Sequence, residues 1–212
     1  MDPYGWYVQR RMLNAMVQNN WKEAERYNQN LIRHSGSSMG LQYNLALVSL
    51  GLGKKQEAYS LLTQAVETFG ESLRLCRLLG DIQYLDGQAD QAKRWYSSAL
   101  EDNPNEKESK LLALRLEILN DPDRYARVME NQKDLPLALQ AMETDPQRSL
   151  SLYLHIVEDD PTQVESLNNI GVLYLENFKN APLAEQYFSR VLELVDHTGA
   201  AKNLAKVRKR KA

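Results

Sequence analysis

The sequence has few of the residues on which catalysis and metal binding usually rely. It contains one cysteine, Cys76, and three histidines in 212 residues. A single cysteine excludes an internal disulfide and agrees with a reducing compartment. The histidines (His34, His155 and His197) do not lie at a spacing from a serine or cysteine that suits catalysis, and the carboxylates are scattered as on ordinary solvated helices. We therefore expect no enzymatic activity, no bound metal and no cofactor.

Long apolar runs are also missing. The opening MDPYGWYVQRRMLNAM lacks the basic start and the run of about seven or more apolar residues that a secretory signal needs. Net charge is −2, so the overall balance does not favour nucleic acid or an acidic membrane as a partner. Hydrophobic residues make up 43%, which is normal for a folded chain. These features predict a cytoplasmic protein with no membrane insertion.

What the sequence does contain is an internal repeat. The stretch SLRLCRLLGDIQYLDGQADQAKRWYSSALEDNP, residues 72–104, is typical of two helices joined by a turn at Gly87. Gly80 lies where the first helix must pack tightly on the second, and Ala92 is the small residue at their crossing. Ala92, Ala58 and Ala24 recur at a constant interval of 34 residues. Several such matches at one period are hard to obtain by chance.

These residues resemble the tetratricopeptide repeat (TPR) family, whose signature has this order and this period. The resemblance implies an all-α fold: a right-handed superhelix, or solenoid, of stacked helix-turn-helix hairpins with a C-terminal capping helix. We expect one array over residues 1–212. Its predicted parts are repeats 4–36, 38–70 and 72–104, a degenerate repeat 107–131, repeats 133–161 and 164–196, and a capping helix with a basic tail, 198–212.

The pattern is irregular in two places. The stretch RYARVMENQ after Asp123 is short and polar for a second helix, and we expect a bend between Asp121 and Asp134. At the C-terminus, Ala201, Leu204 and Ala205 fall where a further first helix would place its packing residues. The basic residues that follow suit a solvated end of the array. A nuclear address or a nucleic-acid patch is the alternative for this cluster.

The family resemblance also implies a binding surface. In TPR proteins the first helices of successive hairpins line a concave groove, and residues at fixed repeat positions point into it. An exposed apolar and aromatic patch there would mark a partner site, and arginine suits a carboxylate. The alternative is that some of these aromatics are core, or that the N-terminal segment folds over them. Carried over to this sequence, the groove residues are Trp6, Gln9, Leu13, Tyr43, Asn44, Leu47, Arg74, Arg77, Asp81 and Tyr84.

One family variant grips acidic chaperone tails with a set of Lys, Asn and Arg residues. Asn44 and Arg74 match two of its five positions, but Gln9, Leu13 and Leu78 depart from the pattern. These departures argue against a cochaperone role.

The resulting hypothesis is a non-enzymatic interaction module. It would bind a protein or peptide that combines apolar anchors with an acidic group. Two alternatives stay open: a self-assembling module that forms a homo-oligomer, and a docking subunit of a larger complex.

Overall fold

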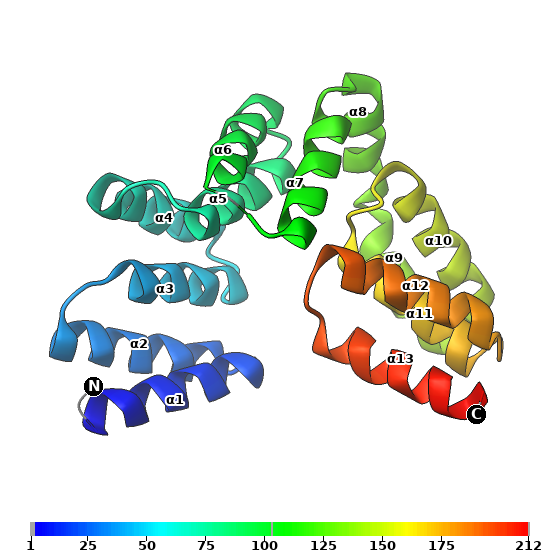
Figure 1. Ribbon diagram of the computed structural model, residues 1–212, viewed down its shortest axis with the longest axis horizontal. Coiled ribbons are helices and arrows are strands. Elements are labelled where there is room, and N and C mark those ends of the chain that lie inside the picture. The colour runs from blue at the N-terminus through cyan, green and yellow to red at the C-terminus, as the bar shows by residue number, and fades with distance from the viewer. Residues whose placement is uncertain (1–2, 103, 212) are drawn as a thin grey trace. The chain divides into compact units, whose positions relative to one another are not determined.

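The computed structural model describes residues 3–102 and 104–211, with side chains as far as Lys209. Over these residues the chain forms thirteen α-helices and no strand, so the all-α fold is confirmed as a solenoid of helical hairpins (Figure 1). The chain divides into two compact units, residues 1–103 and 104–212. Asn103, within the third predicted repeat, Ala212, and the side chains of Arg210 and Lys211 in the predicted basic tail lie outside the described part. The repeat boundaries remain predictions.

The first unit consists of three hairpins. Each helix packs against the next one along the chain, and the pairs α1/α2, α3/α4 and α5/α6 form the closest contacts (Figure 1). Its helices are α1 (Pro3–Val17), α2 (Trp21–Ser35), α3 (Met39–Gly51), α4 (Lys55–Phe69), α5 (Leu73–Leu85) and α6 (Ala89–Glu101).

The three hairpin turns of this unit share one backbone geometry. Asn19, Gly53 and Gly87 adopt positive φ values of 55°, 75° and 76°. The amide of the next residue then donates to a carbonyl five residues back, at 2.8 Å in the first two turns and 2.9 Å in the third. Glycine adopts this left-handed conformation freely, and asparagine is one of the few residues that substitute for it. Gly87 therefore closes its turn as expected, and Gly53 and Asn19 take the same role in the second and first hairpins.

Small residues allow the two helices of a hairpin to approach. A Cβ added at Gly80 would lie 2.5 Å from the ring of Tyr96, and one at Gly171 would lie 2.6 Å from the ring of Phe188. Both rings are fully buried, as is Ala92 at the α5/α6 crossing. The tight packing expected at Gly80 and Ala92 is confirmed.

The second unit is built around one hydrophobic cluster that α9 to α13 share with Leu111 of α7. The hairpins α9/α10 and α11/α12 continue into α13, which packs against α12. Its helices are α7 (Glu106–Leu119), α8 (Pro122–Asn131), α9 (Asp134–Thr144), α10 (Pro146–Asp159), α11 (Val164–Glu176), α12 (Ala181–Leu194) and α13 (Thr198–Lys211). Pro146 lies in the first turn of α10, where its missing amide hydrogen would have no helical partner.

The irregular region forms α8, a helix of 10 residues. Asp159 at the end of α10 holds it: the Asp159 carboxylate accepts from Arg127 Nε at 2.9 Å and from Asn131 Nδ2 at 3.1 Å. The Asp159 carbonyl accepts from Arg124 Nε at 2.8 Å. Lys107 and Lys110 tie α7 to Asp196 and Glu193, with Nζ–O distances of 2.6 and 2.5 Å. The short polar stretch is thus a helix fastened by polar contacts.

The expected packing residues of α13 were partly wrong. Leu204 is buried, but Ala201 and Ala205 are exposed, and Ala200 and Val207 are the other buried residues. Ala200, Leu204 and Val207 lie at i, i+4 and i+7, so the predicted helical face was rotated. The first helix of a full hairpin also buries a face against its second helix, as α11 does against α12, but the described residues contain no helix after α13, so this face of α13 is exposed.

Candidate partner-binding surface

The structure brings four of the predicted groove residues together on α3 and α5. Tyr43 lies half-buried on α3, and Arg74, Arg77 and Asp81 lie on one side of α5 at i, i+3 and i+7. Burial raises the pKa of the Tyr43 phenol, Arg77 and Arg74 oppose this rise, and Asp81 adds to it. Arg74, Arg77 and Asp81 therefore each lie within electrostatic reach of Tyr43. We call these four residues the Tyr43 surface.

Asp81 is oriented from the core of the α5/α6 hairpin. The hydroxyl of Tyr96 donates a hydrogen bond of 2.9 Å to Asp81 Oδ1. Tyr96 is itself fully buried, with its ring against Gly80. A buried aromatic ring has little freedom to move, so the carboxylate of Asp81 has a fixed position beside Arg77.

Arg74 differs from the other charged residues of the Tyr43 surface. Its side chain is exposed, and it makes no hydrogen bond or ion pair with the part of the chain that the structure describes. A guanidinium group carries its charge at any physiological pH and offers a planar set of donors. Arg74 is therefore the cation of this surface that remains available to a ligand.

Tyr84 does not belong to this surface. It was expected to be exposed, but its exposed fraction is 0%, and its ring centroid lies 6.3 Å from that of Tyr96. The ring packs beside Tyr96 inside the hairpin, where burial of its large apolar area stabilises the fold. The expectation of an exposed Tyr84 is therefore corrected: it is a core residue.

Two further predicted residues lie on α3. Leu47 is half-buried one helical turn after Tyr43 and so shares its side of the helix. Asn44 is also half-buried, one position further around α3.

The remaining predicted residues lie on α1. Trp6, Gln9 and Leu13 surround a hollow of about 360 Å³ together with Arg10 and Asn14. Trp6 is 52% exposed, Leu13 45% and Val17, one turn further along, 84%. The guanidinium carbon of Arg10 lies 5.5 Å from the centre of the Trp6 ring. We call Trp6, Arg10, Leu13 and Val17 the α1 outer face; the sequence reasoning did not include Arg10 and Val17.

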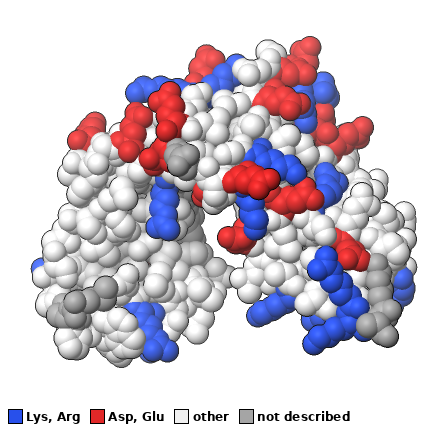
Figure 2. All heavy atoms as spheres, viewed as in Figure 1, with Lys and Arg blue, Asp and Glu red and all other residues white. Residues whose placement is uncertain are grey.

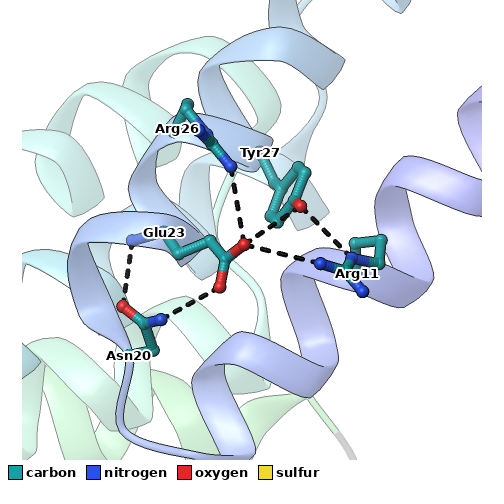
Figure 3. Close-up of polar contacts among 5 residues, drawn as sticks. All are labelled: Arg11, Asn20, Glu23, Arg26 and Tyr27. Carbon is teal, nitrogen blue, oxygen red and sulfur yellow. Dashed lines mark hydrogen bonds and ion pairs between the residues drawn. The ribbon is translucent and has the colours of Figure 1, made fainter.

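Two other cations of the first hairpin, Arg11 and Arg26, already form ion pairs within it. Figure 3 shows the carboxylate of Glu23 between Arg11, Arg26 and Tyr27. Glu23 Oε1 lies 3.6 Å from Arg11 and 3.5 Å from Arg26, and it accepts from the Tyr27 hydroxyl at 3.1 Å. Asn20 caps α2 and donates to Glu23 Oε2 at 2.9 Å. This network holds α1 on α2 and leaves Arg10 as the cation on the outer side of α1.

Three further properties of the described residues concern metal binding, the Cys76 thiol and membrane crossing. Residues 3–102 and 104–211 contain no group of three or more His, Cys, Asp or Glu side chains arranged to hold a metal ion. Cys76 is buried, and burial raises the pKa of its thiol, which disfavours the reactive thiolate. Among these residues, none of the helices has both the length and the apolar character needed to cross a membrane.

Solved structures with a similar fold include tetratricopeptide repeat domains. The TPR2AB domain of yeast Sti1, in complex with pHSP90, matches with a TM-score of 0.51 and 13% identity over 98% of this chain and 84% of that one. The P58(IPK) TPR domain matches with a TM-score of 0.51 and 15% identity over 98% of this chain, which spans 65% of that one. MamA from Desulfovibrio magneticus RS-1, from residue 41 to its end, matches with a TM-score of 0.50 and 13% identity over 92% and 96%.

The sequence comparison is more local. Residues 49–116 match the family model described as the tetratricopeptide repeat, and no curated protein matches the sequence. Stacked helical hairpins with exposed side chains that make no hydrogen bond or ion pair among the described residues, such as Arg74, are typical of helical-repeat scaffolds for protein–protein interaction. The predicted resemblance to the tetratricopeptide repeat family is therefore confirmed over residues 49–116, and the fold is that of tetratricopeptide repeat structures.

Proposed function

We propose that the first unit is a non-enzymatic binding module that holds a peptide segment of a partner protein across the Tyr43 surface. The observation that carries this proposal is Arg74, an exposed guanidinium without a partner among the described residues, beside the half-buried Tyr43. A carboxylate of the partner would form a charge-assisted, two-pronged contact with Arg74. Because its raised pKa keeps Tyr43 neutral, its hydroxyl is a hydrogen-bond donor as well as an acceptor.

The order of charges along α5 further defines the partner. Arg74 and Asp81 are seven residues apart, or about 10 Å along the helix. A carboxylate near Arg74 is favoured, whereas a second one near Asp81 would be repelled. We therefore propose a segment with a single acidic group or free C-terminus at the Arg74 end, a neutral or basic group near Asp81, and apolar side chains for Leu47 and the α1 outer face. The Sti1 domain in complex with pHSP90 supports a protein ligand for this fold.

The first experiment is a peptide-display selection on the intact chain, followed by fluorescence anisotropy with the enriched peptide. Replacing Arg74 with glutamate should weaken binding by about tenfold or more, because a carboxylate then faces the acidic group of the peptide. Lys22→Glu is the matched control: Lys22 is exposed on α2, has no contact with the described residues, and the charge change is the same.

Equal loss in both variants would show only a general charge effect. Enrichment of peptides without any acidic group, or unchanged binding by Arg74→Glu, would contradict the proposed role of Arg74.

A second function, self-association, is favoured by the α1 outer face. Trp6, Arg10, Leu13 and Val17 follow a spacing of four, three and four residues along one side of a helix. In an antiparallel pair of α1 helices, Trp6 would lie opposite Val17 and Arg10 opposite Leu13 of the other copy. The α1 helix carries no carboxylate to pair with Arg10 of the other copy. Each Arg10 instead stacks on Trp6 of its own copy, which keeps the two guanidinium groups away from the twofold axis.

Light scattering at several protein concentrations tests this function. If it holds, the chain is a dimer at micromolar concentration, and Trp6→Ala shifts it to a monomer because it removes the largest apolar contact. Tyr7→Ala is the control, since Tyr7 is equally exposed on α1 but off the outer face. A monomeric unmodified chain would rule out self-association at that concentration and leave the α1 outer face to a foreign partner.

A further inference from the structure

The last helix of the chain carries charge of one sign only. The α13 sequence TGAAKNLAKVRKRK contains no aspartate or glutamate. Its apolar side, formed by Ala200, Leu204 and Val207, lies in the hydrophobic cluster of the second unit. The amide of Ala200 also donates to His197 Nδ1 at 2.9 Å, which caps the start of the helix. The helix is therefore fixed in one orientation. Its cations are Lys202, Lys206, Arg208, Lys209, Arg210 and Lys211.

Three of these cations form a strip on the side opposite the buried residues. Lys202, Lys206 and Lys209 are exposed at i, i+4 and i+7, and they make no hydrogen bond or ion pair with the described residues. Arg208, by contrast, is held by Glu185 of α12, with an Nε–Oε1 distance of 3.1 Å. We call the three residues the α13 lysine face. Figure 2 shows lysine and arginine gathered at the lower right, over the α13 of Figure 1.

Stabilising the helix end does not account for this strip. Cations are favoured within the last turn of a helix, where they compensate the negative end of the dipole. This reason covers Arg208 to Lys211, but Lys202 is the fifth residue of the helix and Lys206 the ninth. A solvated end of a repeat array also needs only polar residues, and surfaces that serve solubility usually mix both signs.

We propose that the α13 lysine face is a second docking surface, and that it binds an acidic segment of a partner protein. Lys202 and Lys206 are about 6 Å apart along the helix. Alternate side chains of an extended segment are about 6–7 Å apart, so a segment with a carboxylate at every second residue matches this spacing. The complementarity is purely one of charge, because α13 has no exposed aromatic side chain.

A short acidic segment fits this face better than the other polyanions. The strip from Lys202 to Lys209 is only about 10 Å long. Carboxylates lie next to α13 in the sequence: Glu185 and Glu193 on α12, and Asp196 in the loop between α12 and α13. A nucleic-acid duplex would extend past the strip toward these carboxylates, and α13 offers no aromatic ring for base stacking. A bilayer would need the apolar side of the helix, which is already buried in the core.

The probe is a fluorescein-labelled peptide of alternating glutamate and serine, with the glutamine–serine peptide as its uncharged counterpart. Anisotropy with the full chain should show saturable binding of the acidic peptide only, weakened by added salt. Lys202→Gln combined with Lys206→Gln should reduce the affinity by about tenfold. Lys22→Gln with Lys93→Gln is the matched control: it removes two lysines of the first unit that make no hydrogen bond or ion pair with the described residues, and it should leave the affinity within about twofold.

Three outcomes would overturn the proposal. These are no binding of the acidic peptide, equal loss in the two double variants, or tighter binding of a single-stranded oligonucleotide or of phosphatidylserine vesicles than of the peptide. Because the Tyr43 surface lies in the first unit, Arg74→Glu should leave this binding unchanged, so the two proposals can fail separately.

Discussion

Replacing Gly171 with alanine is expected to lower the free energy of unfolding by about 1–3 kcal/mol. The new Cβ would lie 2.6 Å from Cε1 of Phe188, which is closer than non-bonded carbon atoms approach. Phe188 is fully buried within the core of the second unit, so its ring cannot move into solvent. The helices α11 and α12 would have to separate, and α13 with its lysine face would loosen with them.

Thermal or urea unfolding measures this loss, and Gly40→Ala is the control. Gly40 is also a helical glycine, but nothing lies within 4 Å of an added Cβ there. That variant should be neutral or stabilised by up to about 1 kcal/mol, because alanine favours the helix. Phe188→Leu should recover part of the stability of Gly171→Ala, since a smaller side chain leaves room for the methyl group. Equal effects at Gly171 and Gly40 would contradict the tight crossing.

Close helix crossings of this kind, formed within each hairpin, explain why so much of the fold could be predicted from the sequence. A repeat hairpin is defined by contacts between residues close in the chain, such as Gly80 with Tyr96 or Gly87 at the turn. Small and turn-forming residues are needed at those places, and their interval reveals each copy. Where a first helix has no second helix to pack on, as for α13 among the described residues, this reasoning placed Ala201 and Ala205 in the core although both are exposed.

The candidate site was less predictable because exposure depends on neighbouring helices. A positional rule predicted Arg74, Arg77 and Asp81 as groove residues together with Tyr43; they lie on one side of α5 because residues at this helical spacing share a face. The same rule failed for Tyr84, since an aromatic side chain gains more from packing beside Tyr96 than from exposure. That the Tyr96 hydroxyl orients Asp81 has no signal in the sequence, as the two residues lie on different helices.

Asp159→Ala is expected to destabilise α8 selectively, by about 1–3 kcal/mol. The substitution removes the two carboxylate acceptors that α10 offers to α8, those for Arg127 Nε and Asn131 Nδ2. Asn131 is only 5% exposed, so its amide would be left buried without this acceptor. Arg127 is largely exposed and can be solvated instead, so most of the loss comes from Asn131. The bond from Arg124 to the Asp159 carbonyl is retained.

Hydrogen exchange measured by mass spectrometry can localise this effect. Peptides covering 122–131 should exchange faster, whereas those of α11 and α12 should not, because repeat units open locally. Glu158→Ala is the matched control: it removes an exposed carboxylate from the adjacent position of α10 that contacts no described residue. If α8 stays protected without the Asp159 carboxylate, then the apolar packing of Tyr125 and Val128 and the retained contacts of Arg124 are sufficient to hold it. The hydrogen bonds to the Asp159 carboxylate would then contribute little to the stability of α8, and the irregular region would be stabilised in the same way as the regular hairpins.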